Sequence, residues 1–186
     1  MADLNNQAVA FVTANEGVEQ PELTSPWEAV EKAGGRPVLV ATEPGKVQAF
    51  NHLDRGDVFT VDRTTKEAAV ADIAALVLPG GVANADQLRT DPAAVALVTR
   101  FFDTGRPVAV ICHGPWAIVE ADRARGRTMT SWPSLRTDIT NAGGTWVDQA
   151  VQVCTAGPNT LISSRKPDDL EAFNAALLEG LAADRR

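Results

Sequence analysis

The chain has 186 residues, of which 45% are hydrophobic and 22% charged, a composition typical of a globular protein, and we expect one domain spanning residues 1–186. Its 17 Lys and Arg residues and 24 Asp and Glu residues give a net charge of −7, which repels phosphate backbones and argues against a nucleic-acid partner. No apolar run reaches the roughly 20 residues of a membrane-spanning helix, and the N-terminus does not resemble a secretory signal, so we expect no membrane partner.

Short apolar runs along the chain predict strands that are buried on both faces. They lack the polar alternation of a half-exposed strand, and such runs are typical of a parallel sheet covered by helices. A polar middle segment predicts a small additional strand pair, and a later segment predicts two more strands joined by a Gly-Pro-Asn turn. The four runs are residues 8–12, 38–40, 75–78 and 108–111, and the two further segments are 46–62 and 146–163.

Segments with helical periodicity separate these strands. Residues 25–33 begin with Ser-Pro, which suits an N-cap and a first helical position, and they end at a Gly-Gly pair. Residues 92–104 carry an apolar stripe, and a last helix begins near Pro167 with acidic residues in its first turn. The alternation of strands and helices predicts an α/β three-layer sandwich.

The segment from residue 106 to residue 116 is the strongest candidate for chemistry. A buried strand ends directly before Cys112, and Pro115 suits the first turn of a helix. Such a strand–turn–helix arrangement exposes a nucleophile above a sheet, although the G-x-S-x-G spacing is absent. A thiol at a helix N-terminus has a lowered pKa, because the helix dipole favours the thiolate. The alternative is a buried, unreactive cysteine, and position alone does not decide between the two.

Two further strand ends are expected at the same edge of the sheet, where ligands of parallel sheets bind. The first strand runs into an acidic loop, residues 13–22. The third runs into Gly80 and Gly81, whose backbone can approach a substrate closely and present N–H groups as an oxyanion hole. The three features together favour a functional site over three unrelated turns.

The sequence offers two histidines as a general base for this site. His113 adjoins the cysteine, but neighbouring residues on a helix point apart, so His113 can serve Cys112 only if the turn bends sharply. A Glu22 carboxyl beside the sulfur is a second candidate partner. His52 is interpreted as a structural or surface residue.

The remaining candidates have simpler interpretations. Cys154 lies in an alternating strand pattern and is interpreted as packing, whereas Trp116 either lines the pocket or packs in the core. Two cysteines build no disulfide framework, which favours a reducing, cytoplasmic location. Neither the histidines nor the cysteines have metal-ligand spacing, so we expect no metal.

Five segments, in order, resemble the PfpI-type intracellular proteases of the ThiJ/PfpI superfamily, which is related to the class I glutamine amidotransferases. The likeness covers nearly the whole chain, from Val9 to the last helix. A glutaminase role is disfavoured, because His113 stands where the amidotransferases have glycine after their nucleophile. The segments are LPGG at 78–81, ICHGP at 111–115, TSWPS at 130–134, NAGGTWVD at 141–148 and SRKPDDL at 164–170.

The resemblance implies a flavodoxin-like parallel sheet with a nucleophile elbow. Cys112 would be the nucleophile, with Glu22 beside it and Glu19 as a second pocket carboxylate. The backbone N–H groups of Gly81 and His113 would form the oxyanion site.

The resemblance also implies a homodimer or a larger oligomer. In PfpI-like oligomers an acid from the neighbouring subunit orients the histidine, and that position corresponds to Asp86 here, acting in trans. This chain departs from the pattern in two ways: the acid is Asp rather than Glu, and the loop 82–85 is one residue longer than in some relatives.

The activity implied is that of a cofactor-independent cysteine hydrolase or lyase in the stress response. It would act on peptide, glycated or aldehyde carbonyls, as an intracellular protease, a protein deglycase or a glyoxalase-like enzyme. Two alternatives stay open. One is a redox-sensing or chaperone-like stress protein whose Cys112 is oxidised without turnover, and the other is an assembled scaffold with a vestigial site.

Overall fold

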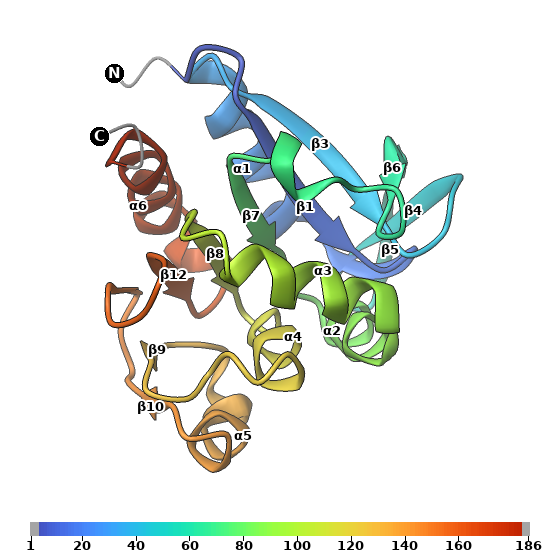
Figure 1. Ribbon diagram of the computed structural model, residues 1–186. Coiled ribbons are helices and arrows are strands. Elements are labelled where there is room, and N and C mark those ends of the chain that lie inside the picture. The colour runs from blue at the N-terminus through green and yellow to red at the C-terminus, as the bar shows by residue number, and fades with distance from the viewer. Residues whose placement is uncertain (1–3, 184–186) are drawn as a thin grey trace.

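A seven-stranded sheet forms the centre of the molecule (Figure 1). This computed structural model describes residues 4–183. Neighbouring strands are parallel, except for the pair β11–β12 at one edge. The strands in spatial order are β11 (Val151–Cys154), β12 (Leu161–Ser164), β8 (Val108–Ile111), β7 (Ala75–Leu78), β1 (Ala8–Thr13), β3 (Arg36–Ala41) and β6 (Arg63–Thr64).

The apolar runs of the sequence are the inner strands β1, β3, β7 and β8. Every residue of β1, β7 and β8 is buried, which explains why these strands show no polar alternation. The two strands expected near the C-terminal end are β11 and β12. The prediction of a mainly parallel sheet is confirmed.

Helices cover both faces of the sheet and make it the middle of three layers. Each face of the sheet has its own hydrophobic core, and alternate side chains of β1 point into one or the other. Val9 and Phe11 pack with α1 and α6 on one face, whereas Ala10 and Val12 pack with α2, α3 and α4 on the other. In Figure 1, α3 crosses the near face of the sheet. The helices are α1 (Gln20–Lys32), α2 (Val82–Thr90), α3 (Pro92–Phe102), α4 (Pro115–Glu120), α5 (Arg136–Asn141) and α6 (Leu170–Ala183), with short 3-10 turns η1 (Val70–Asp72), η2 (Pro133–Leu135) and η3 (Pro167–Asp169).

The first helix begins earlier than the sequence predicts. It starts at Gln20 instead of residue 25, with Pro21 in its first turn, so that Pro26 lies inside the helix. Ser25, predicted as the N-cap, instead accepts a hydrogen bond from the Asn174 side chain of α6 at 2.8 Å. The expected acidic loop is therefore the strand β2 (Glu16–Glu19) followed by the first turn of α1.

The expected loop at residues 82–85 is the first turn of helix α2. Gly81 has φ +89° and redirects the chain into this helix. Asn84 fixes the turn from its buried position: its side-chain oxygen accepts the N–H of Ala14 at 2.7 Å, and its amide donates to the carbonyls of Pro79 and Gly80 at 3.1 and 2.9 Å.

Smaller sheets decorate this core. The expected strand pair of the middle segment is the hairpin β4 (Lys46–Asn51) and β5 (Asp54–Thr60), and β2 joins it as a third strand that the sequence did not predict. The hairpin tip therefore lies at the same end of the fold as β2. A second pair consists of β9 (Thr128–Met129) and β10 (Thr145–Trp146).

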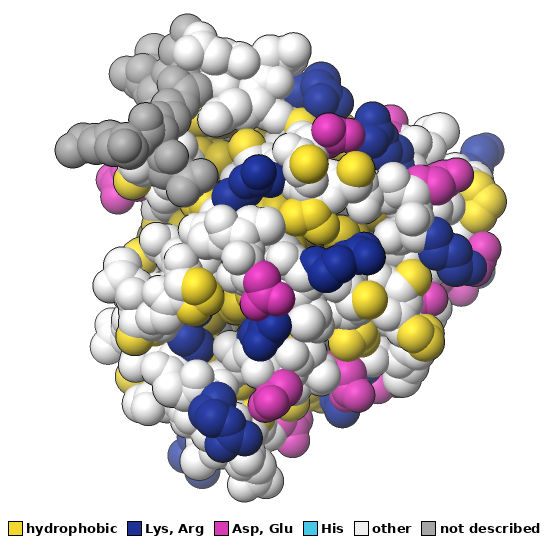
Figure 2. All heavy atoms as spheres, viewed as in Figure 1, with side chains coloured by type: hydrophobic (Ala, Val, Ile, Leu, Met, Phe, Trp, Pro, Cys, Tyr) yellow, Lys and Arg dark blue, Asp and Glu magenta, His cyan; other side chains and the backbone are white. Residues whose placement is uncertain are grey.

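On the face drawn in Figure 2, basic and acidic side chains are interspersed rather than gathered into patches of one sign. None of the helices within residues 4–183 combines the length and the apolar character that a membrane crossing demands.

Candidate active site

Cys112 occupies a sharp bend between β8 and α4. Its φ is +61°, a left-handed conformation that few residues other than glycine adopt. The bend is held by hydrogen bonds from the Cys112 N–H to the Ser164 carbonyl at 3.1 Å and from the Trp132 N–H to the Cys112 carbonyl at 2.9 Å. As a result, Nδ1 of His113 lies 3.1 Å from Sγ of Cys112, although the two residues are adjacent in the chain. The bend that the sequence required for a Cys–His pair is present.

Glu22 reaches the same sulfur from the first turn of α1. Its carboxyl is fully buried, accepts the N–H of Gly80 at 2.8 Å, and contacts the Cys112 thiol. Gly80 leaves room for this contact: a Cβ at that position would overlap the Glu22 carboxylate and would lie 2.6 Å from the Cβ of Cys112. Three elements that are distant in sequence, α1, the end of β7 and the end of β8, therefore meet at one thiol.

Burial sets the charge of the two side chains beside Cys112. Removal from water raises the pKa of Glu22 to about 8. The hydrogen bond from the Gly80 N–H lowers this pKa, and the negative charge of Glu19 raises it further, but both effects are smaller than that of burial. Burial also lowers the pKa of His113 to about 4. At neutral pH the site therefore holds a protonated carboxyl and a neutral imidazole.

Contrary to the prediction from the sequence, the dipole of the following helix does not lower the pKa of the Cys112 thiol. Burial raises its pKa, and an ionised Glu22 raises it further, whereas the N–H groups of Gly81 and His113 act on the sulfur in the opposite direction. The expected lowering is wrong because α4 has only six residues and the sulfur is largely removed from water. At neutral pH the Cys112 sulfur is therefore held as the neutral thiol.

The thiol lies in a cavity of about 870 Å³. The His113 ring contacts the ring of Trp116 edge-on, at 5.2 Å between centroids, and stacks on Trp132 at 5.9 Å. Trp116 is fixed by a 2.8 Å hydrogen bond to Asp138 and also packs against the core, so both interpretations of this residue hold. The cavity lining includes Glu16, Glu19, Glu22, Phe50, His52, Leu53, Gly81, Val82, Asp86, Cys112, His113, Trp116 and Trp132.

Comparison with known proteins identifies the family. Residues 7–180 match the DJ-1/PfpI family. The chain belongs to the DJ-1/PfpI family. This assignment agrees with the ThiJ/PfpI resemblance of its sequence segments and with the flavodoxin-like sandwich.

Individual DJ-1/PfpI relatives are similar over most of their length. "Putative cysteine protease YraA" of Bacillus subtilis (strain 168) is 35% identical over 163 residues, 88% of this chain and 92% of the relative. "Protein/nucleic acid deglycase 2" of Escherichia coli (strain K12) is 37% identical over 165 residues, 89% of this chain and 92% of the relative.

A solved structure shares the same fold. It is a two-domain protein with DJ-1/ThiJ/PfpI-like and ferritin-like domains from Anabaena variabilis ATCC 29413, with a TM-score of 0.84 and 31% identity. The match covers 93% of this chain and 47% of the solved chain, so this DJ-1/PfpI chain spans about half of that protein's length.

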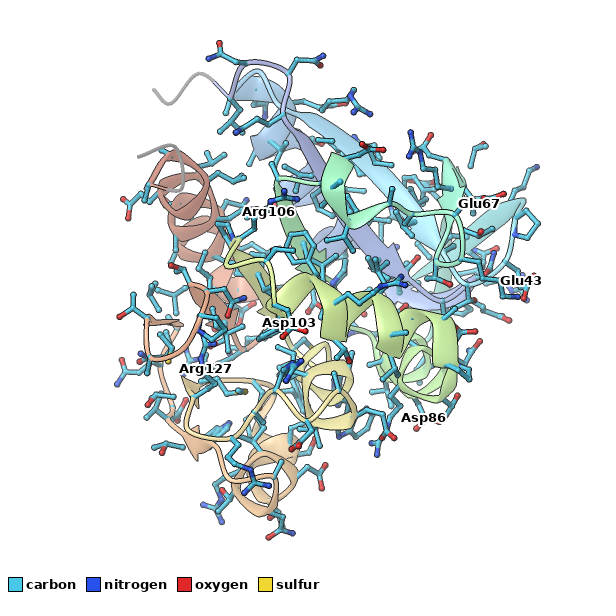
Figure 3. All side chains as sticks on the ribbon, viewed as in Figure 1. Glu43, Glu67, Asp86, Asp103, Arg106 and Arg127 are labelled. Carbon is cyan, nitrogen blue, oxygen red and sulfur yellow. The ribbon has the colours of Figure 1, made fainter. Side chains whose placement is uncertain are left out.

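The carboxylates of the outer cavity differ in their surroundings. Glu19 ends β2, and its carboxylate accepts the backbone N–H of His52 at 3.3 and 3.2 Å, while the His52 side chain is 85% exposed at the hairpin tip. Asp86 projects from α2 (Figure 3) and lines the cavity. Within residues 4–183 no group bonds to Nε2 of His113, so one DJ-1/PfpI chain alone leaves this nitrogen without an acid partner.

Among the cavity residues that sequence reasoning missed are three exposed apolar side chains of the rim. Leu53 is 94% exposed at the tip of the β4–β5 hairpin, Val82 begins α2, and Trp132 follows β9. No local pattern marks these residues, because the rim forms only when the hairpin, α2 and the segment after β9 meet. The TSWPS segment was the one available indication for Trp132.

Proposed function

We propose that this chain is a cofactor-independent cysteine hydrolase that acts on the carbonyl groups of small aldehyde adducts or short peptides. The observation that carries the proposal is the 3.1 Å approach of Cys112 Sγ to His113 Nδ1 inside a cavity, with Glu22 at the same sulfur. The names of the two relatives, a cysteine protease and a deglycase, support the same chemistry. A volume of about 870 Å³ favours a short substrate over a folded protein.

The first step is addition of sulfur to the carbonyl carbon. The thiol proton moves to Nδ1 of the neutral His113 as the S–C bond forms, and the carbonyl electron pair moves onto oxygen. We propose that the N–H groups of Gly81 and His113 receive this oxyanion, and their hydrogen bonds to the Cys112 sulfur support this role. Addition to an aldehyde gives a hemithioacetal by the same movement of electrons.

The second step uses the protonated carboxyl. For an amide, Glu22 donates its proton to the departing nitrogen as the C–N bond breaks, which leaves a thioester and a carboxylate. That carboxylate then takes a proton from the water that attacks the thioester, and the proton on His113 returns to the released sulfur. One water is consumed, and both side chains regain their initial protonation.

A substrate panel tests the reaction. We expect at least one of methylglyoxal, a glycated peptide and a fluorogenic peptide to be turned over, and Cys112→Ser to lower that rate about a thousandfold or more. Cys154→Ser is the matched control, because it makes the same change at a thiol outside the cavity, and its turnover should stay within about threefold of wild type.

The panel also separates the enzyme from its alternatives. Absence of any Cys112-dependent turnover would reject the hydrolase proposal. If Cys112 were then oxidised by peroxide, as read by intact mass, the redox-sensing alternative would be favoured. We propose a cytoplasmic location as well, supported by the two free cysteines.

We propose further that the site is completed by a second copy of the chain. Three of the exposed large hydrophobic residues, Leu53, Val82 and Trp132, lie around the cavity, as expected of a surface that a neighbouring subunit covers. The unbonded Nε2 of His113 offers a position for Asp86 of that neighbour. We expect light scattering at micromolar concentration to give a dimer or a larger assembly.

Subunit complementation tests the role of Asp86. Asp86→Asn should lower turnover about 10- to 100-fold. Co-expression of Asp86→Asn with Cys112→Ser should restore about a quarter of wild-type activity in a dimer, since half of randomly formed dimers are mixed and each has one intact site. An active monomer, or failure of the mixture to recover activity, would contradict action in trans.

A further inference from the structure

A second cysteine lies beside a buried cation at the opposite end of the sheet. Arg127 precedes β9 (Figure 3) and is only 4% exposed. Its guanidinium donates to the Asn159 side-chain oxygen at 2.8 Å, to the Asn159 carbonyl at 2.8 Å and to the Cys154 carbonyl at 3.1 Å. All of these acceptors are neutral.

The positive charge of Arg127 has no carboxylate to balance it. Within the described part of the chain, residues 4–183, no Asp or Glu forms an ion pair with Arg127, and its buried Nε has no hydrogen-bond partner. A guanidinium stays protonated at all accessible pH values, and a buried charge without a counter-ion is strongly destabilising. The surroundings of Arg127 therefore favour an anion.

The Cys154 thiol is the group placed to supply that anion. It ends β11, and its Sγ accepts the backbone N–H of Thr128 at 3.4 Å, while as a thiol it makes only a long contact, 3.9 Å, to the carbonyl oxygen of Ala156. Burial on its own raises the pKa of Cys154, but hydrogen bonds at the sulfur, the largest from the Thr128 N–H, together with the nearby charge of Arg127, outweigh burial and hold the pKa below its ordinary value.

We propose that Cys154 is a second reactive thiol, a thiolate ion-paired with Arg127, and that it is a modification site for small hydroperoxides. The thiolate sulfur attacks one oxygen of hydrogen peroxide, so that an S–O bond forms and the O–O bond breaks. The departing hydroxide takes up the remaining peroxide proton and leaves as water. Sulfur is oxidised by two electrons, and the product is a sulfenate whose charge stays beside Arg127.

The position of Cys154 allows a small oxidant to reach it. Cys154 is 5% exposed, and the chain that follows it, residues 155–158, is exposed. Hydrogen peroxide is close to water in size, and the neighbouring residues 155–158 lie at the surface.

The two cysteines are too far apart to form a disulfide with each other. Cys154 pairs with Leu161 and Leu161 with Val108, whereas Cys112 follows Ile111 at the other end of β8. Cys112 is four residues beyond Val108, which corresponds to roughly 13 Å along a strand, and two strand spacings correspond to roughly 10 Å. Each distance exceeds the Cα separation of about 7 Å that a disulfide tolerates. The sulfenate therefore has no resolving thiol in its own chain.

The pH dependence of oxidation tests the proposal. In Cys112→Ser, where Cys154 is the sole thiol, we expect limiting hydrogen peroxide to add one oxygen by intact mass and to give a dimedone adduct on the peptide that contains Cys154. At about pH 6.5 the rate should exceed that of glutathione about tenfold, and with rising pH it should level off earlier than the glutathione rate does. A rate that climbs with pH in parallel with glutathione, or the absence of an adduct, would overturn the proposal.

Arg127 variants identify the source of the reactivity. Arg127→Met, combined with Cys112→Ser, should return the pH profile to that of an ordinary thiol, whereas Arg127→Lys should keep the profile because it keeps the charge. Equal profiles in the Met and Lys variants would refute the ion pair. If circular dichroism shows that the Arg127→Met variant does not fold, the pH profile of oxidation in Cys112→Ser alone decides whether Cys154 is a reactive thiol. None of these readouts depends on turnover, so the hydrolase proposal stands or falls separately.

Discussion

Glu22→Gln is expected to lower turnover by about 10²- to 10⁴-fold while the alkylation rate of Cys112 at neutral pH stays within about threefold of wild type. Burial holds the pKa of Glu22 at about 8, so the native side chain is already neutral at pH 7, and glutamine has the same shape and charge. A glutamine oxygen can still accept the N–H of Gly80. The variant therefore removes the transferable proton and little else.

The pH profile of the wild type should carry the signature of the same group. Above about pH 8 the acid form of Glu22 is lost, and its negative charge raises the pKa of Cys112 as well. Both effects lower kcat/KM on the alkaline side. In Glu22→Gln the fall near pH 8 should be absent, because nothing at this position titrates. A matching fall in both proteins would reject Glu22 as the proton donor.

Stability provides the control against misfolding. The folded pKa of Glu22, about 8, lies above its usual value of 4.5, so its contribution to stability is full below about pH 4.5 and is lost as pH rises towards 8. Glutamine does not ionise, and the variant should be more stable than wild type at pH 7 by up to about 3 kcal/mol in urea unfolding. Glu28→Gln, the same change at an exposed position of α1, should alter stability by less than about 0.5 kcal/mol and leave turnover unchanged.

The elements predicted well from the sequence are the strands that are covered by helices on both faces of the sheet. The runs that became β1, β7 and β8 are buried at every residue, and such strands leave a continuous apolar signal. Helix α2 leaves no such signal, since only Asn84, Ala85 and Leu88 of its nine residues are buried. Its start depends on the conformation of Gly81 and on hydrogen bonds from Asn84 to other segments, which no periodicity records.

The composition of the site was easier to predict than its protonation. The rule that parallel strands end at one edge, together with the family resemblance, indicated Cys112, Glu22 and the Gly-Gly pair, and the structure brings them into contact. The charge of each group depends on how completely α1 and α4 exclude water, which sequence spacing does not reveal. The partners Arg127 and Cys154 are likewise 27 residues apart and form no motif.

Gly81→Ala is the second change expected to have a large effect. At φ +89° an alanine is strained, and its Cβ would overlap the Gly17 carbonyl oxygen and lie 2.7 Å from the Glu19 nitrogen. Both are backbone atoms of β2, which is held by its pairing with β4, so neither can move freely. We expect a loss of about 2–4 kcal/mol in stability, and a loss of turnover greater than the unfolded fraction explains, because the Gly81 N–H shifts away from Cys112.

Gly126→Ala separates backbone strain from displacement of the site. Gly126 also has a positive φ, +72°, but a Cβ there would meet no atom within 4 Å. This variant should lose only about 1 kcal/mol and keep wild-type turnover. Urea unfolding and kcat/KM at a temperature where both variants are folded make the comparison. If kcat/KM fell equally in Gly81→Ala and Gly126→Ala, backbone strain would account for the whole loss of turnover. That result would mean that the Gly81 N–H does not support the reaction.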